Sequence, residues 1–235
     1  MTQRVPRVAI VGAGPSGLFA AQALLARDPD VLIDVIDRLP TPFGLLRYGV
    51  APDHTSIQAM QPRLAEPLRS ERVRFFGMVE FGKTLTRADL VDSYDAVIYA
   101  AGASEDRRLG IDGEELAGSR SAREFVAWYC GHPDAAHQSL AGVHSAMTFG
   151  VGNVAVDVAR VLSVASSHLA ATDMPGPVLD ELRASEVADV WLVGRRGPQH
   201  ASFTTTELRE LLELPGVQPL VDAADLEGID LGTLD

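Results

Sequence analysis

Residues 8–17 of the chain, Val-Ala-Ile-Val-Gly-Ala-Gly-Pro-Ser-Gly, decide the fold. They end in a complete G-x-G-x-x-G motif, Gly12-Ala13-Gly14-Pro15-Ser16-Gly17. In this motif the first glycine permits a tight turn, the second lets the backbone meet a pyrophosphate, and the third lets the next helix pack closely on the strand. Because an apolar strand at 5–11 precedes the motif and helical spacing of apolar residues at 18–25 follows it, the sequence predicts a dinucleotide-binding turn between strand and helix.

An acidic residue supports this prediction at the end of the next predicted strand, residues 31–36. Asp37 lies twenty residues after Gly17 and is followed by Arg38. A carboxylate at this place accepts hydrogen bonds from ribose hydroxyls and repels a 2′-phosphate. The first turn therefore suits FAD or NAD better than NADP. A further strand at 95–100 ends in small residues, including Ala101 and Gly102, which let a ligand approach the backbone.

A second turn of the same kind follows a predicted strand at 145–149. It is Gly150-Val151-Gly152-Asn153-Val154-Ala155, with alanine at the third position, which the motif permits. The strand predicted at 187–193 ends not in an acid but in Gly194-Arg195-Arg196-Gly197. Guanidinium groups bind phosphates through charge-assisted bonds that are often bidentate, so this turn favours NADP.

Two units of strand, helix and strand in one chain predict an α/β fold with two Rossmann-like dinucleotide-binding units, each of three layers. We expect an FAD-binding domain at residues 1–104 and an incomplete NADP-binding domain at 105–235, with the boundary near the charged, glycine-bearing stretch at 104–113. The pattern also predicts helices at 56–68, 156–164 and 205–212 and short strands at 73–76 and 79–81.

Composition and net charge argue against several classes of function. The 235 residues carry a net charge of −12, which makes nucleic acid a poor partner. The single cysteine, Cys130, excludes an internal disulfide, a thiolate metal cluster or a redox-active dithiol within these residues, and we expect no metal site. No run approaches the ~20 apolar residues that span a bilayer. The apolar run 8–11 is too short for a signal peptide, so we expect a cytosolic protein without membrane insertion.

Thr204 and Glu207 form a T-x-x-E pattern at the start of the last predicted helix. This spacing is typical of a capping box, in which the acid accepts a bond from the backbone of the first residue. Alternatively, Glu207 orients the arginines or a cofactor. Spacing alone favours the cap.

Taken in order, the segments VAIVGAGPSG, PTPFGLLRYGVAPDH, GVGNVAVDVAR, VGRRGP and FTTTELRE resemble the adrenodoxin-reductase-type ferredoxin–NADP reductases. The resemblance runs from about Val8 to the end of the chain, and the Pro-Phe-Gly-Leu loop that ends in Asp53-His54 is its most specific part. Members pass electrons from NADPH through FAD to an iron–sulfur protein. The resemblance implies the same cofactors, a ferredoxin as partner, and a proton-handling or positioning role near the flavin and nicotinamide for His54 and Asp157. The simpler interpretation of His54 is a buried loop histidine bonded to backbone, and that of Asp157 is an acid in the first turn of a helix.

The motifs and the resemblance together give two sets of expected cofactor contacts, in which Asp37 stands where the family has a glutamate. The FAD set is Gly12, Ala13, Gly14, Pro15, Ser16, Gly17, Asp37, Arg38, Gly44, Leu45, Val79, Phe81, Ala101 and Gly102. The NADP set is Gly150, Val151, Gly152, Asn153, Val154, Arg195, Arg196 and Glu207.

Family members are about twice as long, and their chain returns to the FAD domain with a Trp-Gly segment that has no match here. We therefore expect a truncated form of the fold, and two alternatives stay open. One is a flavoprotein like the small subunit of glutamate synthase, against which the single cysteine argues. The other is a non-catalytic nucleotide-binding fragment. Neither the oligomeric state nor the particular ferredoxin follows from the sequence.

Overall fold

The structure is a computed structural model that describes residues 4–103 and 106–227. These residues form two compact units. The first contains the described residues up to Val50 together with His54–Gly110, and the second contains Ala51–Asp53 and the described residues from Ile111 onward. The expected boundary at 104/105 falls on residues outside the described ones. The three-residue segment Ala51–Asp53, which clusters with the second unit, was not anticipated.

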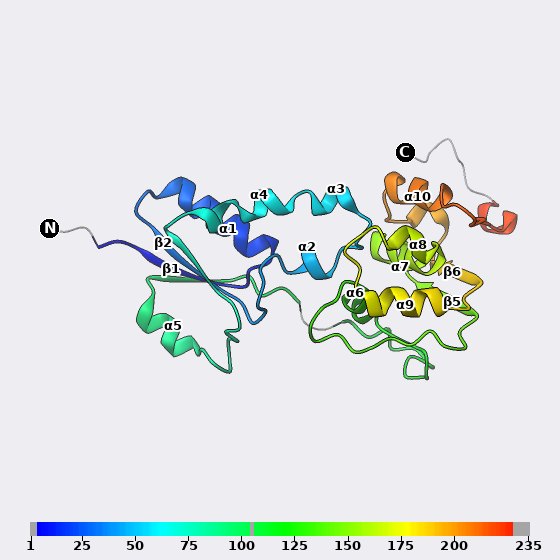
Figure 1. Ribbon diagram of the computed structural model, residues 1–235, viewed down its shortest axis with the longest axis horizontal. Helices are drawn as coiled ribbons and strands as arrows, with labels where there is room; N and C mark the ends of the chain where they lie inside the picture. Colours follow the sequence, from blue (N-terminus) through cyan, green and yellow to red (C-terminus); the bar gives the residue numbers. More distant parts are fainter. Residues whose placement is uncertain (1–3, 104–105, 228–235) are drawn as a thin grey trace. The chain divides into compact units, whose positions relative to one another are not determined.

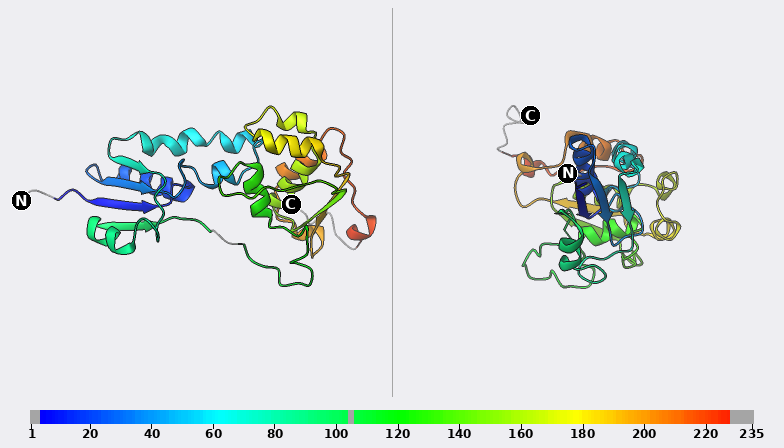
Figure 2. Two further views of the ribbon diagram at one scale, coloured as in Figure 1. Left: turned by 60° about the horizontal axis from the view of Figure 1, so that its bottom comes forward. Right: turned by 90° about the vertical axis from the view of Figure 1, so that its left-hand side faces the viewer.

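The first unit is built on a parallel sheet. Among its described residues, four strands pair in the order β3-β2-β1-β4, namely β3 (Val73–Phe76), β2 (Leu32–Ile36), β1 (Arg7–Val11) and β4 (Ala96–Tyr99). They lie side by side and run in the same direction (Figure 2). The central strand β1 pairs Val8 with Ile33 on one side and with Ala96 on the other. Apolar runs such as β1 suit this arrangement, because a parallel sheet is covered on both faces.

Helices cover both faces of this sheet, so the predicted three layers are present in the first unit (Figure 1). One face packs against α1 (Pro15–Arg27) and α4 (Gln61–Ala65), with Ile10, Leu18 and Ile33 fully buried between them. The other face packs against α5 (Arg87–Ser93), whose Leu90 is buried beside Ala9 and Ile36. Alternate residues of one strand thus serve two cores, as the two-residue period of a strand requires.

Two expected elements of the first unit are wrong in detail. The single helix expected at 56–68 is broken into α3 (Thr55–Gln58), α4 and the 3-10 helix η1 (Glu66–Arg69). Proline stands in the first turn of α4 and of η1, where its missing N–H costs least. The strand expected at 79–81 is only an isolated bridge between Phe81 and Leu85. The short helix α2 (Leu45–Tyr48) begins after Gly44.

The second unit also has a parallel pair of strands, β5 (Ser145–Phe149) and β6 (Asp189–Val193). The helix α7 (Asn153–Ser163) connects the second turn to this unit's core and contacts both strands. Its core also takes buried residues from α6 (Ala122–Tyr129), α8 (Ser166–Leu169) and α9 (Gly176–Ala184). The remaining elements are η2 (Pro198–His200), α10 (Thr205–Leu212) and η3 (Ala223–Leu226).

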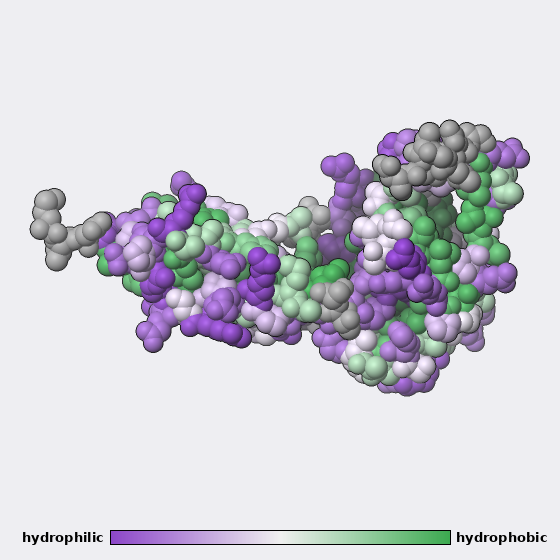
Figure 3. All heavy atoms as spheres, turned by 90° about the horizontal axis from the view of Figure 1, so that it is seen from above, coloured by the Kyte–Doolittle hydropathy of each residue, from purple (hydrophilic) through white to green (hydrophobic). Residues whose placement is uncertain are grey.

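One face of the β5–β6 pair is left uncovered by the described residues. Met147 pairs with Trp191 across the two strands, and both side chains are exposed, as is Phe149. Figure 3 shows hydrophobic residues gathered at the end of this unit where β5, β6 and η3 lie.

Within the described part of the chain, none of the helices has the length and apolar character needed to cross a bilayer. The cytosolic location remains a prediction.

Candidate functional site

The backbone of the first turn has the shape that the G-x-G-x-x-G motif predicts. Gly12 has φ +112°, and a side chain there would collide with the carbonyl of Ala100. A side chain at Gly17 would collide with the carbonyl of Gly12, so the helix packs directly on the turn. Gly14 is different: a Cβ there would meet nothing closer than the Cα of Gly44, at 3.9 Å. Gly14 is the N-cap of the 13-residue helix α1, so the turn leaves space at the positive end of a helix dipole.

Asp37 binds the turn itself. One carboxylate oxygen accepts a hydrogen bond from the backbone N–H of Ala13 at 2.7 Å, and the other accepts from the N–H of Leu39 at 2.9 Å. Each oxygen has a further lone pair, so the carboxylate can still accept from a ribose hydroxyl. Asp37 is thus a structural brace of the first turn as well as a candidate ligand of the cofactor.

The loop at 43–45 lies against this turn. The N–H of Phe43 donates to the carbonyl of Ala13 at 2.8 Å, and Gly44 places its backbone beside Gly14. Both Phe43 and Gly44 have positive φ, at 91° and 48°, a strained conformation for phenylalanine. Leu45 follows with two thirds of its surface exposed. The loop therefore presents Gly44 and Leu45 next to the space beside Gly14.

The other expected FAD contacts belong to the same unit. Val79 donates its N–H to the carbonyl of Asp37 at 3.0 Å. The ring of Phe81 lies 5.2 Å from that of Tyr99. Arg38, Ala101 and Gly102 are exposed. The structure connects Val79 to the first turn through Asp37. Val79, Phe81, Ala101 and Gly102 remain predicted contacts.

A buried carboxylate that the sequence analysis missed lies inside the first sheet. Asp34 of β2 accepts two bonds from Arg74 of β3, both at 2.7 Å, and one from the hydroxyl of Tyr94 at 2.7 Å. Burial raises the pKa of Asp34, but the bonds from Arg74 and Tyr94 outweigh burial and hold that pKa below its usual value. Burial, followed by the bond to Asp34, raises the pKa of Tyr94 to about 12. This group stabilises the sheet and lies outside both turns.

The second turn repeats the geometry with its own partners. Gly150 has φ +138° and donates its N–H to the carbonyl of Val193 at 2.9 Å. Gly152 is the N-cap of the 11-residue helix α7. The side chain of Asn153 accepts from the N–H of Thr204 at 2.9 Å, so the segment before α10 is fastened to the turn. Val154 is exposed at the start of α7.

Arg195 and Arg196 follow β6 after Gly194 and are exposed. Neither guanidinium makes a hydrogen bond or an ion pair with another described residue. Two exposed guanidinium groups without a protein partner in the described ranges are able to bind a phosphate, the role that the sequence suggested.

Glu207 lies in the first turn of α10 and is buried. Thr204 does cap α10, because its side chain accepts from the N–H of Glu207 at 3.3 Å. However, the N–H of Thr204, from which a capping-box acid would accept, donates to Asn153. The carboxyl group of Glu207 is instead buried, with 7% of the residue exposed. Burial of an acid beside the second turn favours the alternative in which Glu207 serves the site.

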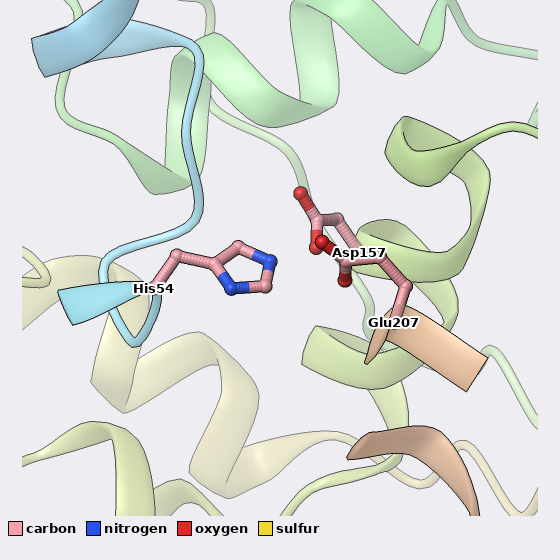
Figure 4. A group of neighbouring side chains, drawn as sticks. All are labelled: His54, Asp157 and Glu207. Carbon is pink, nitrogen blue, oxygen red and sulfur yellow. The ribbon is translucent and has the colours of Figure 1, made fainter. Parts of the chain in front are cut away.

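Asp157 and Glu207 face one another within the second unit. Figure 4 shows their carboxylates together, from α7 and α10, and these oxygens lie within 4.8 Å of each other. Asp157 is the fifth residue of α7, past the free N–H groups of the first turn, so the simple reading of a first-turn acid is wrong. It accepts instead from Arg160 at 2.9 Å.

Arg160 is the residue of this group that the sequence analysis missed. Only 4% of its side chain is exposed, and it forms ion pairs with Asp157 and with Asp53 of the three-residue segment. Burial lowers its pKa, and the negative charges of Glu210 and Glu207 oppose that effect. The only sequence signal was an arginine three residues after an acid on a helix that is otherwise apolar.

His54 follows Asp53 directly and is 6% exposed. Its carbonyl accepts from the N–H groups of Ile57 and Gln58 at the start of α3, and Figure 4 draws its side chain on the loop that leads into this helix. The role expected for His54 and Asp157 remains a prediction.

The geometry defines a class of protein. Two glycine turns each join a parallel strand to a helix, one with an acid after the next strand and one with two arginines. The chain is thus an α/β protein with two Rossmann-like turns of the kind that binds dinucleotides.

The comparisons agree with this class and make it more specific. A sequence profile described as an NAD(P)-binding Rossmann-like domain matches residues 10–60. The chain is 47% identical to the NADPH-ferredoxin reductase FprA of Mycobacterium leprae, over 96% of this chain and 51% of that protein. It is 43% identical to the mitochondrial NADPH:adrenodoxin oxidoreductase of Bos taurus, over 97% of this chain and 46% of that protein. The resemblance predicted from the motifs is confirmed.

A comparison with solved structures gives the same resemblance. Mycobacterium tuberculosis FprA in complex with NADPH matches with a TM-score of 0.93 and 46% identity, over 97% of this chain and 51% of that one. This chain therefore spans about half the length of the relatives that it resembles.

Proposed function

We propose that this chain carries the FAD and NADP sites of an oxidoreductase that passes electrons between NADPH and a ferredoxin. The observation that carries the proposal is the contrast between its two turns. Asp37 supports the first turn, and Arg195 and Arg196 follow the strand beside the second. Because the two sites differ in charge where a ribose 2′ substituent would lie, they suit different dinucleotides.

The first unit fits FAD. The space beside Gly14, the start of α1 and the nearby backbone of Gly44 accommodate a pyrophosphate, since no side chain fills that space. Asp37 accepts from a ribose hydroxyl. We assign the predicted FAD-binding domain to this unit, with Leu45, Val79 and Phe81 as further contacts.

The second unit fits NADP. The start of α7 at Gly152 and Asn153 offers N–H groups to the pyrophosphate, while Arg195 and Arg196 bind the 2′-phosphate. Glu207 and Asp157 place carboxylates next to this turn. We assign the predicted NADP-binding domain to this unit.

The residues of the chain bind and orient the cofactors, and they exclude the wrong dinucleotide from each turn. When bound, FAD supplies the chemistry that converts hydride donation by NADPH into electron transfer to an iron–sulfur protein. His54 and Asp157 hold or position a proton in this proposal. The ferredoxin partner is supported by the names of the relatives, which are an NADPH-ferredoxin reductase and an NADPH:adrenodoxin oxidoreductase.

The purified chain tests the FAD assignment. A flavin absorption spectrum, present on purification or after addition of FAD, supports it, and a colourless chain that FAD cannot reconstitute contradicts it. If flavin is retained, NADPH-dependent reduction of cytochrome c should require added ferredoxin. Reduction of cytochrome c that ferredoxin does not change would contradict the proposed partner.

The NADP assignment is tested by the ratio of the dissociation constants for NADH and NADPH. The double variant Arg195→Ala/Arg196→Ala should lower this ratio by about 100-fold, since two charge-assisted bonds to the phosphate are lost at an exposed site. The matched control is Arg107→Ala/Arg108→Ala, which removes the same charge from another exposed arginine pair. Equal effects of the two double variants would show that only net charge matters and would refute the assignment.

A further inference from the structure

Three buried acids surround one buried arginine in the second unit. Arg160 forms ion pairs with Asp53 and Asp157, whose side chains are 9% and 12% exposed. Glu207 is also buried, and its charge, like that of the exposed Glu210, acts on Arg160. A buried guanidinium and the acids paired with it hold one another in place, because a buried charge is tolerated only where it is paired and hydrogen-bonded.

The partners of Arg160 are parts of the chain that the function uses. Asp157 lies one helical turn after Asn153 of the second glycine turn and faces Glu207. Asp53 belongs to the segment Ala51–Asp53, where Ala51 is fully buried in the core of the second unit. Asp53 also immediately precedes His54. One side chain therefore fixes both a candidate site acid and the residue next to the candidate histidine.

We propose that Arg160 is a positioning residue of the NADP site, which holds the carboxylates of Asp157 and Asp53 in fixed places. The inference rests on the proposed function. Arg160 acts through these two acids, since its side chain is 96% covered by protein.

Other titratable groups near Asp157 come from the neighbouring elements. Tyr129 and Cys130 lie on and after α6, and burial, followed by the charges of Cys130 and Asp157, raises the pKa of Tyr129 well above its usual value. Glu207 and Glu210 lie on α10. The strand β5 carries no titratable residue, and Asp189 of β6 is exposed. Arg160 forms an ion pair with Asp157 within the second unit.

The test uses Arg160→Met, which keeps the length but removes the charge, and Arg160→Lys, which restores the charge without the planar fork. The matched control is Arg183→Met, because Arg183 and Asp180 form an ion pair at 2.7 Å with the same three-residue spacing, but on the surface of α9. The first measurement is the ¹³C NMR signal of the Asp157 carboxyl carbon in the ligand-free chain at pH 7. The second is the affinity for NADP⁺ at the same pH.

In Arg160→Met the carboxyl signal of Asp157 should move and broaden at pH 7, because the carboxylate loses the partner that fixes it. The affinity for NADP⁺ at pH 7 should fall by about tenfold. Arg160→Lys should recover part of both effects and serves as the informative variant if Arg160→Met does not fold. Arg183→Met should change neither.

An Asp157 carboxyl signal that is unchanged in both Arg160 variants overturns the inference. So does a changed Asp157 signal with unaltered NADP⁺ affinity, which would indicate a merely structural ion pair. If the unaltered chain binds NADH as well as NADPH, or binds neither, the proposed function fails, whereas the carboxyl signal of Asp157 still decides whether Arg160 holds that carboxylate in place.

Discussion

An Asp37→Ala substitution removes the carboxylate that braces the first glycine turn. It leaves two backbone N–H groups, those of Ala13 and Leu39, without the oxygens that now lie at 2.7 and 2.9 Å. Ala13 is fully buried and Leu39 is 8% exposed, so water replaces these bonds poorly. We therefore expect the first unit to lose stability even when no cofactor is present.

The size of the effect follows from these contacts. A hydrogen bond to a charged group contributes about 1.5–3 kcal/mol, and a buried donor left without an acceptor loses most of this. Allowing for water near Leu39, the two bonds together contribute about 3 kcal/mol. In a unit of about 100 residues this corresponds to a fall of roughly 15 °C in the melting temperature.

Hydrogen exchange followed by mass spectrometry measures the effect in the correct unit, since peptides from β1 and β2 report on the first sheet. Both tryptophans, Trp128 and Trp191, lie in the second unit, so their fluorescence serves as an internal control that should not change. The matched variant is Asp28→Ala, whose carboxylate accepts from the N–H of Asp30 at an exposed site and should contribute less than about 0.5 kcal/mol. Equal loss of protection in Asp37→Ala and Asp28→Ala would refute the bracing role.

Two further predictions concern the same unit. Because the pKa of Asp34 is lowered in the folded state, its contribution to stability is present above its unfolded pKa of about 3.9 and is lost as the pH falls through the folded value. Asp34→Asn should therefore cost about 3 kcal/mol at pH 7 and much less at pH 3 in urea denaturation, and an equal cost at both pH values would contradict this reasoning. Gly12→Ala should destabilise the unit by more than about 3 kcal/mol and abolish flavin binding, whereas Gly82→Ala, which has a similar positive φ but open space around it, should cost about 1 kcal/mol. If thermal unfolding shows that Gly12→Ala and Gly82→Ala lose the same stability, the collision with Ala100 does not destabilise the unit and the reasoning is wrong.

The sequence predicted both glycine turns because each local requirement is encoded locally. Gly12 and Gly150 adopt positive φ, and the strand and helix on either side follow apolar periodicity. The sequence predicted secondary structure less well where no strong motif sets the backbone conformation. Residues 56–68 have helical spacing, but the two prolines at 62 and 67 divide them into three short helices. Residues 79–81 have the composition of a strand and yet form only one bridge.

The sequence predicted those site residues that belong to a motif. It did not predict the role of residues whose surroundings are set by packing. The T-x-x-E spacing correctly predicted that Thr204 caps α10. It did not predict that the N–H of Thr204 donates to Asn153, from another part of the chain, or that Glu207 is buried. Arg160 pairs with Asp53, which is 107 residues away in sequence. No local pattern encodes such a contact, so a buried arginine on an apolar helix is indistinguishable in sequence from an exposed one.

The central claim is that the two turns take different dinucleotides, and an NMR titration of the ¹⁵N-labelled chain with NADP⁺ tests it most directly. We expect shifts of the backbone amides of Gly150–Asn153 and of Arg195 and Arg196, which shrink when NAD⁺ replaces NADP⁺ at the same concentration. Shifts at Gly12–Gly17 with unchanged amides at the second turn would contradict it.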